Sequence, residues 1–449
     1  MIDGVSLCAV DGTHESEFLS GVIEGFYGKP WTRAERIELF GWMARWGLNT
    51  YFYAPKDDLH HRALWREPYG AADAGELALL VDAGRQRNIR FVYALSPGLD
   101  IRYRDETELD RLYARFEQML AMGCEHFSLL FDDIPDRLEP QDIARWGSLA
   151  SAQCHVANAV FAWIRGTVPG ARFIFCPTAY CGSMARRNLG GEGYLATIGR
   201  ELWPEIDVLW TGPNIISPEI SVTHVQELQD VLRRKPLIWD NLHANDYDGR
   251  RFFCGPYSGR PQELRSMVAG LLSNPNNEFP LNYVPLRTLA EFARCEGTWD
   301  PRTSYLAAMR EWLPSFATVG RPIVLEDLIL FGDCYYLPHE EGPEAEALCE
   351  CVRGLLARDS ANWDDDAAAF RQRANRLREV CVGVTELRHR PLFHALSRRI
   401  WDLREQLDLV ERYLDFTSGQ GRDFQLPASD RGGMAARLRH LVRQQAGGK

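Results

Sequence analysis

The chain contains 449 residues, of which 45% are hydrophobic and 25% are charged, and its formal net charge is −11. This composition is ordinary for a soluble globular protein with a large core, and the length fits a barrel with one appended domain. The acidic balance argues against nucleic acid as a partner, because a protein that neutralises phosphates needs a basic face.

The sequence also argues against a membrane partner and against export. No window reaches the roughly 18 consecutive apolar residues that a membrane-spanning helix requires. The N-terminal segment MIDGVSLCAVDGTHESEF has neither the basic start nor the apolar run of a secretory signal. We therefore expect a cytoplasmic protein.

The eleven cysteines are an odd number and are scattered through apolar runs, as at Cys124, Cys154 and Cys176. This distribution is typical of reduced cysteines in a core. Cys349 and Cys351 are separated by one residue, which is not the spacing of a zinc site. The cysteines therefore indicate neither a disulfide framework nor a metal site.

Short apolar runs alternate with helical stretches through the first two thirds of the chain. The predicted strands are residues 21–27, 49–55, 89–95, 126–131, 172–177, 207–211 and 236–239. The predicted helices are residues 32–46, 72–86, 109–122, 150–164, 194–202, 222–234 and 261–267. Residues 269–274 and 278–283 are alternative candidates for an eighth strand.

Apolar strands that each precede a helix are typical of a parallel sheet buried on both faces. Eight such units predict an α/β protein with a (β/α)8, or TIM, barrel. The alternative is an open, doubly wound sheet. It normally needs fewer units, and no GxGxxG turn follows the first predicted strand.

The strand signal fades after the barrel, which predicts two domains, residues 1–297 and a helical domain at 298–449. Apolar residues there recur at spacings of three, four and seven, as expected for one face of a long helix. These are Leu392, Leu396, Leu403, Leu407, Val410 and Leu414. The face fits a bundle within the chain, or a stalk through which two copies form a homodimer.

The adjacent carboxylates Asp132 and Asp133 follow the apolar run Leu129–Phe131 directly. In a TIM barrel the carboxyl ends of the strands surround the active-site mouth. Neighbouring carboxylates repel each other, so we expect one raised and one low pKa, as the acid and the anion of glycoside hydrolysis require. The alternatives are an N-cap or turn, and a magnesium site, which would need more carboxylates.

Other predicted strand ends also carry polar or aromatic side chains. Lys56 follows the second strand, Tyr180 the fifth, and residues 239–248 (WDNLHANDYD) the seventh. Carboxylates, amides and aromatic rings are the groups that bind a sugar, through its hydroxyls and its ring face. His243 and Asp246 could instead hold a metal, but no second His or Cys lies at ligand spacing.

Eight segments together resemble glycoside hydrolase family 84, which contains the protein O-GlcNAcases and related bacterial β-N-acetylglucosaminidases. They are GVIEGFYGKPW (residues 21–31), LNTYFYAPKDD (48–58), SPGLDI (96–101), LLFDDI (129–134), FCPTAYCG (175–182), LWTGP (209–213), IWDNLHANDYD (238–248) and SNPN (273–276). The C-terminal third is similar in character to the family's helical stalk, although no motif there matches. No room remains for the acetyltransferase-like domain of the large animal enzymes.

The resemblance implies a retaining exo-β-N-acetylglucosaminidase that needs no cofactor or metal. In such enzymes the substrate's own 2-acetamido oxygen attacks the anomeric carbon, and water then opens the oxazoline. Asp132 resembles the residue that binds and orients the acetamido N–H, and Asp133 resembles the general acid and base. Tyr180 is similar to the residue that steadies the acetamido oxygen, Trp239 to a wall of the acetyl pocket, and Asn241 to a hydrogen-bond partner near Asp132.

The same resemblance assigns the remaining sugar contacts. Gly25, through its backbone carbonyl, and Lys56 are similar to the residues that hold the 3-hydroxyl. Asp246 and Asn274 resemble those that hold the 4- and 6-hydroxyls. A sugar contact by Asn274 would place it at the barrel mouth, which favours residues 269–274 as the eighth strand. None of these nine positions departs from the family pattern.

Three functions remain open from the sequence. The first is removal of β-linked GlcNAc, either from Ser or Thr of glycoproteins or, as in hyaluronidase-like enzymes and hexosaminidases, from glycans. The second is a non-catalytic module that binds GlcNAc-bearing glycoproteins, which would have lost the Asp pair. The third is a metal-dependent barrel hydrolase, whose activity a chelator would abolish.

Overall fold

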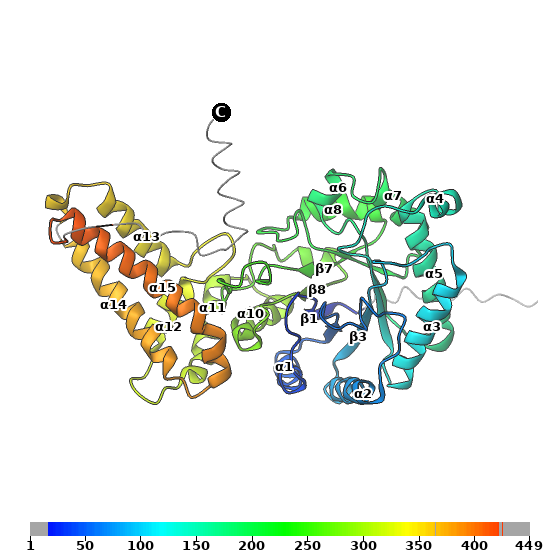
Figure 1. Ribbon diagram of the computed structural model, residues 1–449, viewed down its shortest axis with the longest axis horizontal. Coiled ribbons are helices and arrows are strands. Elements are labelled where there is room, and N and C mark those ends of the chain that lie inside the picture. Colours follow the sequence, from blue (N-terminus) through cyan, green and yellow to red (C-terminus); the bar gives the residue numbers. More distant parts are fainter. Residues whose placement is uncertain (1–16, 364, 422–423, 425–449) are drawn as a thin grey trace, which may run out of the picture.

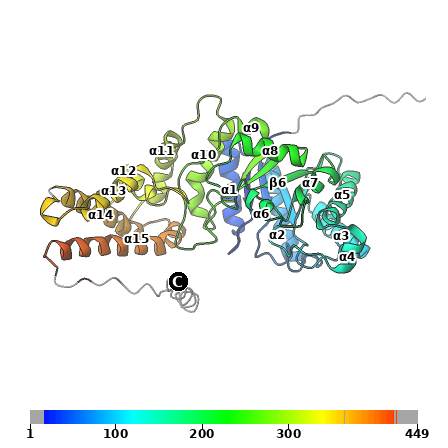
Figure 2. The ribbon, with the colours of Figure 1, turned by 90° about the horizontal axis from the view of Figure 1, so that it is seen from above.

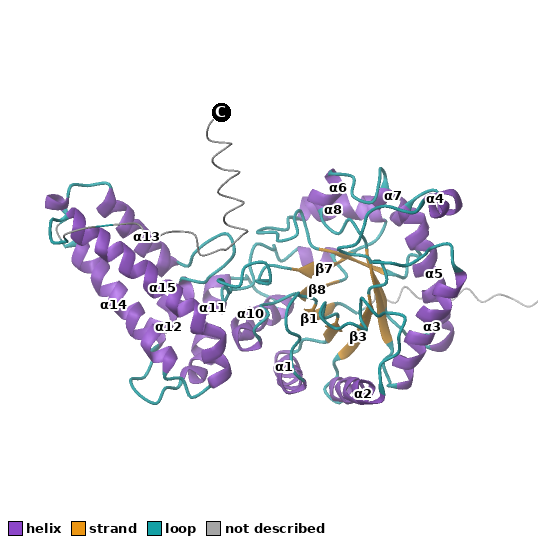
Figure 3. Cartoon of the chain, viewed as in Figure 1, coloured by secondary structure: helices purple, strands orange, loops and turns teal. Residues whose placement is uncertain are grey.

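The computed structural model describes residues 17–363, residues 365–421 and residue 424. It contains a barrel and, beside it, an elongated arm of helices (Figures 1 and 2). Strands gather in the barrel, helices surround them, and the arm is helical (Figure 3). No helix of the described part is both long and apolar enough to cross a membrane.

Eight strands form a closed parallel barrel in the order β1 to β8, which confirms the predicted TIM barrel. Each strand pairs with the next along the chain, and β1 closes the ring by pairing with β8. Their bounds are β1 Leu19–Glu24, β2 Thr50–Tyr53, β3 Arg90–Leu95, β4 His126–Leu130, β5 Phe173–Cys176, β6 Asp207–Trp210, β7 Pro236–Asp240 and β8 Gly270–Ser273.

The helices between the strands cover the outside of the barrel. They are α1 Arg33–Trp46, α2 Ala71–Arg85, α3 Glu106–Ala121, α4 Pro140–Trp146, α5 Leu149–Thr167, α6 Gly182–Arg186, α7 Tyr194–Glu201, α8 Val222–Leu232, α9 Leu264–Met267 and α10 Tyr283–Arg294. Local chemistry sets several of their ends. Thr32 and Glu35 form a capping box at the start of α1, and Gly47 ends it in the left-handed conformation, with φ 75°.

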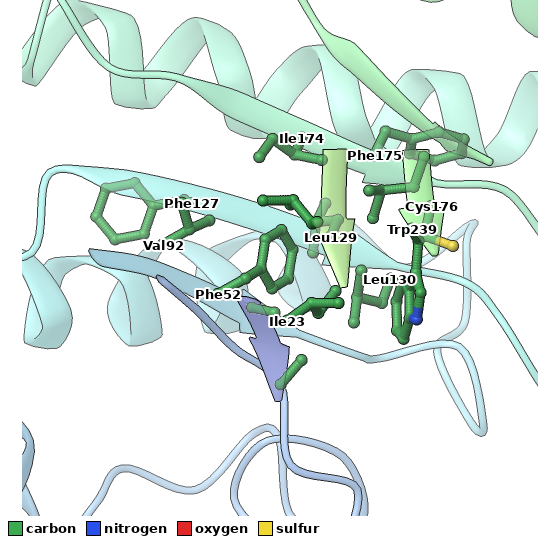
Figure 4. Packing of buried hydrophobic residues seen from close by; sticks show 14 of the residues in the cluster. Ile23, Phe52, Val92, Phe127, Leu129, Leu130, Ile174, Phe175, Cys176 and Trp239 are labelled. Atoms are coloured by element: carbon green, nitrogen blue, oxygen red, sulfur yellow. The ribbon is translucent and has the colours of Figure 1, made fainter. Parts of the chain in front are cut away.

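Apolar side chains from successive strands fill the core. Ile23, Phe52, Val92, Phe127 and Leu129 come from β1 to β4 and are fully buried (Figure 4). Burying a side chain of this size, rather than leaving it exposed to water, stabilises the folded state by about 1.5–3 kcal/mol. Continuous apolar strands are therefore stable only when both faces are covered, as the barrel and its helices provide.

The structure chooses between the two candidate eighth strands and corrects some boundaries. Gly270–Ser273 is the strand, as expected for residues 269–274, whereas residues 278–283 contain the 3-10 helix η1 (Phe279–Asn282) that leads into α10. β1 ends at Glu24 rather than at residue 27, and α9 is a single turn. The short helices α4 and α6 have too few residues to show a helical period and were missed.

The arm consists mainly of five helices: α11 Pro301–Trp312, α12 Leu325–Asp333, α13 Pro343–Leu356, α14 Asp366–Thr385 and α15 Arg390–Thr417, with the 3-10 turns η2 Leu313–Phe316 and η3 Ser360–Asn362. The predicted long helix is confirmed as α15. Leu392, Leu396, Leu407 and Leu414 on its apolar face are buried within the chain, as a bundle requires. A homodimer through these helices remains a prediction.

The arm also supports the barrel. The same apolar cluster includes barrel-side residues such as Leu271, and Arg399 of α15 forms an ion pair of 2.7 Å with Glu278. The backbone N–H groups of Cys254 and Gly255, in the loop after β7, donate to carbonyls of Tyr335 and Tyr336. The predicted division after residue 297 falls between α10 and α11 and remains a prediction.

Candidate active site

A cavity of about 690 Å³ opens at the carboxyl ends of the barrel strands. All nine residues singled out from the sequence line it, although they come from six different strand ends. They are Gly25, Lys56, Asp132, Asp133, Tyr180, Trp239, Asn241, Asp246 and Asn274. Closure of the barrel therefore brings the predicted set together at one mouth, as expected for this fold.

The two adjacent aspartates both line this cavity, which strand geometry alone would not allow. Successive side chains of an extended strand point to opposite faces. β4 ends at Leu130, and Asp133 has the left-handed backbone conformation, with φ 50°. This conformation is unfavourable for a residue with a side chain, so the surrounding contacts must hold it.

Asp132 is buried and forms an ion pair with the equally buried ammonium of Lys56 through Oδ2. Its other carboxylate oxygen, Oδ1, is buried without a hydrogen-bond partner among the described residues. Burying a carboxylate oxygen without a hydrogen-bond partner is energetically costly. A ligand group that donates a hydrogen bond to this oxygen would remove that cost. The site is therefore suited to a ligand with an N–H or O–H at this point.

Burial raises the pKa of Asp132, but the charges of Lys56 and Arg62 outweigh burial and hold it below its ordinary value. Burial also acts on Lys56, where Asp132 outweighs it and raises the pKa of the ammonium. Asp132 is thus the standing anion of the pair, as one half of the sequence prediction required. Burial lowers the pKa of the neighbouring His61 to about 4, so its imidazole stays neutral near pH 7.

Asp133 lies closer to solvent, and two tyrosines bind its carboxylate. Tyr27 donates to Oδ2 at 2.9 Å, and Tyr180 donates to Oδ1 at 2.9 Å. The Tyr180 hydroxyl keeps its proton, because burial raises the pKa of its phenol. The two carboxylates thus point to different partners: Asp132 to an ammonium and Asp133 to hydroxyls.

The Trp239 indole forms an apolar surface inside the cavity, and its Nε1 is buried without a hydrogen-bond partner in the described part of the chain. A methyl group on Gly25 would overlap this ring. A side chain at Gly25 would therefore displace Trp239, because the glycine packs directly against the indole.

Asparagine and aspartate side chains that follow β7 and β8 also line the cavity. Asn274 donates from Nδ2 to Asn241 Oδ1 at 2.9 Å and accepts the Gly25 N–H at 3.3 Å. Asn241 donates to the carbonyl of Ile215 at 2.8 Å. Among the described residues, Asn241 thus forms hydrogen bonds with Asn274 and Ile215 and none with Asp132, although both line the cavity.

Asp246 is held at the rim by the backbone N–H of Tyr27, which donates to Oδ2 at 3.0 Å. The contacts of His243 and Asp246, the alternative metal ligands, give the metal interpretation no support. His243 is fully buried, and its Nε2 lies 3.0 Å from the carbonyl of Gly255. The described residues contain no group of three or more His, Cys, Asp or Glu side chains placed to hold a metal ion.

Sequence reasoning missed several residues of the site. Tyr27 and Tyr247 line the cavity, and Ile215 lies at its edge with 44% of its surface exposed. Arg62 lies behind Tyr27 and binds it. Tyr27 lies two residues beyond Gly25 in the same strand-end segment, which was a usable signal. Nothing in the local sequence marks Arg62, because only the fold brings its loop to the end of β4.

Comparisons with known proteins found a matching family model, similar sequences and a similar fold. The family model for β-N-acetylglucosaminidase matches residues 20–319. The protein O-GlcNAcases of Mus musculus and Rattus norvegicus are each 46% identical over 273 residues, which are 61% of this chain and 30% of theirs. This chain thus matches about 30% of the length of these curated relatives.

Among solved structures, an O-GlcNAc hydrolase mutant from Thermobaculum terrenum superposes with a TM-score of 0.78 at 29% sequence identity. The match covers 89% of this chain and 84% of that one. The similarity thus includes the arm as well as the barrel.

Proposed function

Because the chain belongs to the β-N-acetylglucosaminidase family of glycoside hydrolases, we propose that it removes terminal β-linked GlcNAc with retention of configuration, using the substrate's 2-acetamido group as the nucleophile. The observation that carries the proposal is the buried Asp132 carboxylate, ionised beside Lys56 and with Oδ1 free to accept a hydrogen bond. An acetamido N–H supplies the donor that this oxygen lacks.

In the first step, Asp132 accepts the acetamido N–H and turns the carbonyl oxygen toward the anomeric carbon. Positive charge develops on the amide as the oxazoline forms, and the fixed anion stabilises it in a largely water-free site. Asp133, in its protonated form, gives its proton to the departing glycosidic oxygen. In the second step, Asp133 takes a proton from water, which opens the oxazoline from the same face.

The surrounding residues bind the sugar and the acetyl group. Trp239 forms the apolar wall against which the acetyl methyl group packs, and Tyr180 donates its hydroxyl to the acetamido oxygen. Gly25 and Lys56 hold the 3-hydroxyl, while Asp246 and Asn274 hold the 4- and 6-hydroxyls. Asn241 contributes through Asn274, whose amide orientation it fixes.

The proposed aglycone is Ser or Thr of a glycoprotein. Its support is the 46% identity to protein O-GlcNAcases, together with an open mouth at which the aromatic Tyr247 is 53% exposed. Release of GlcNAc from glycans is the alternative substrate class. A non-catalytic binding module is less favoured, because both aspartates and the buried Lys56 partner are present.

The decisive experiment is hydrolysis of an aryl β-N-acetylglucosaminide, with and without a chelator, while NMR follows the product anomer. We expect release of the β-anomer at a rate that the chelator does not change. Initial release of the α-anomer would contradict the acetamido nucleophile, and loss of activity with chelator would favour a metal-dependent hydrolase. Parallel assays of an O-GlcNAc peptide and of a GlcNAc-terminated glycan distinguish the two substrate classes.

The pH dependence should follow the ion pair between Lys56 and Asp132. In the wild-type protein, Lys56 helps to hold the pKa of Asp132 low, so the anion survives as the pH falls. Lys56→Met removes that positive charge. Burial, which raises the pKa of Asp132, is then opposed less. We expect the acidic limb of the kcat/KM profile to move to higher pH. An unmoved limb would contradict the assignment of Asp132 as the essential anion.

A further inference from the structure

Arg62 joins three strand ends of the barrel at the back of the cavity. It lies in the loop between β2 and α2 and is 9% exposed. Its Nη1 donates to the Tyr27 hydroxyl at 2.7 Å, and its Nη2 donates to the backbone carbonyl of Asp133 at 2.6 Å. Tyr27 in turn donates to Asp133 Oδ2 at 2.9 Å. One guanidinium therefore holds Asp133 by its backbone and, through Tyr27, by its side chain.

The direction of these hydrogen bonds is fixed by chemistry. A guanidinium has donors and no acceptor, so the Tyr27 oxygen must accept from Arg62. A tyrosine hydroxyl carries one proton, which is then available for the Asp133 carboxylate. Without Arg62, the hydroxyl could rotate and donate to water instead. Arg62 thus makes Tyr27 a committed donor to Asp133.

The second contact of Arg62 fixes the backbone. The left-handed conformation at Asp133 is unfavourable for a residue with a Cβ, and it is this conformation that lets adjacent aspartates share one cavity. The backbone carbonyl of Asp133 accepts a hydrogen bond from Arg62 Nη2. A charged donor at 2.6 Å is a strong restraint on that peptide, so losing it would allow the acid to shift away from the leaving oxygen.

We propose that Arg62 is the positioning residue of the general acid: it holds the Asp133 backbone in its left-handed turn and directs the Tyr27 hydroxyl to the Asp133 carboxylate. The inference rests on the proposed function, in which Tyr180 is recruited by the acetamido oxygen when substrate binds. Tyr180 can then no longer restrain Asp133 fully. The Arg62–Tyr27 pair is the restraint that remains while the proton is transferred.

The test compares Arg62→Gln, Arg62→Lys and Tyr27→Phe on aryl β-N-acetylglucosaminides with leaving groups of graded acidity. We expect Arg62→Gln to lower kcat/KM about 30- to 100-fold for the poorest leaving group and less than about 5-fold for the best. A displaced acid loses part of the rate enhancement that proton transfer supplies, and the best leaving groups need little of it. Arg62→Lys keeps the charge but presents no fork, so it should recover only part of the loss.

Two further measurements separate positioning from general damage. Arg66→Gln is the matched control, since Arg66 lies on the same loop but binds Asp100 and Glu108 outside the cavity. It should leave kcat/KM unchanged for every leaving group. Because Arg62 and Tyr27 act through one hydrogen bond, the double variant should be at most about twofold worse than Arg62→Gln.

Equal losses for good and poor leaving groups, or multiplicative losses in the double variant, would overturn the inference while leaving the proposed function intact. Absence of hydrolysis by the wild-type protein would overturn both. If Arg62→Gln does not fold, Tyr27→Phe decides, because it removes a single partly exposed hydroxyl: a loss confined to poor leaving groups supports the restraint, and an unchanged series overturns it.

Discussion

Asp133→Asn is expected to lower kcat/KM about 10²- to 10⁴-fold for substrates with poor leaving groups and much less for activated aryl glycosides. The asparagine amide occupies the same volume but cannot give up a proton to the glycosidic oxygen. A leaving group that is stable as an anion departs without protonation, so it should lose least. The dependence of rate on leaving-group acidity should therefore steepen in the variant.

The measurement is a series of aryl β-N-acetylglucosaminides assayed for kcat/KM, which reports the steps up to departure of the aglycone. Asp136→Asn is the matched control, because it removes the same charge from the same loop at a residue that does not line the cavity. The control should match the wild-type protein across the series. Equal losses at both ends of the series would remove Asp133 from the role of general acid.

Asp132→Asn is expected to slow hydrolysis about 10²- to 10³-fold whatever the leaving group, which is the range for removing one electrostatic contact to a developing charge. The acetamido group loses the anion that orients it and stabilises the charge of the forming oxazoline.

Replacing the acetyl hydrogens of the substrate with fluorine weakens the amide oxygen as a nucleophile. The wild-type rate should therefore fall with each fluorine, and a near-normal rate in Asp132→Asn would contradict substrate assistance.

The same substitution should also destabilise the protein, because it leaves Lys56 buried without its anion. Breaking a buried ion pair costs about 3–5 kcal/mol, whereas replacing both partners by uncharged groups costs far less. The double variant Lys56→Met/Asp132→Asn should therefore unfold closer to the wild-type denaturant midpoint while remaining as slow as the single variant. Recovery of activity together with stability would show that the slow rate of Asp132→Asn comes from misfolding.

The pH dependence of this stability has a defined sign. The folded-state pKa of Asp132 is lowered, so its ionisation contributes stability above the pKa of the unfolded carboxyl. This contribution is lost as the pH falls through the lower, folded-state value. The difference in unfolding free energy between the wild-type protein and Asp132→Asn should therefore shrink as the solution is acidified below about pH 4.

The Arg62–Tyr27 restraint and the buried Lys56–Asp132 pair act on different steps. Variants of Arg62 should alter the response to the leaving group, while variants of Lys56 should alter the pH at which the anion is lost. These two signatures can be measured on one set of substrates. They separate the positioning of the acid from the stabilisation of the acetamido group.

The sequence by itself determined the barrel and nine of the residues that line the cavity. Strands with continuous apolar character cannot be stable unless both faces are covered, and their repetition with helices leaves few alternatives to a closed parallel barrel. Polar residues directly after such strands must then meet at one mouth. Gly25 and Asn274, which are far apart in the sequence, were assigned to one site by the resemblance to glycoside hydrolase family 84, and both line the cavity.

Only the tertiary structure decided how those side chains are paired. The ion pair of Lys56 with Asp132 and the contact of Arg62 with the left-handed turn at Asp133 join segments that are 71 or more residues apart. Periodicity and residue type are local properties, so they indicate which face of a strand is buried and where it ends. Backbone angles and the loops from other strands decide which of the two neighbouring carboxylates forms the ion pair with Lys56. Both become fixed only when the barrel closes.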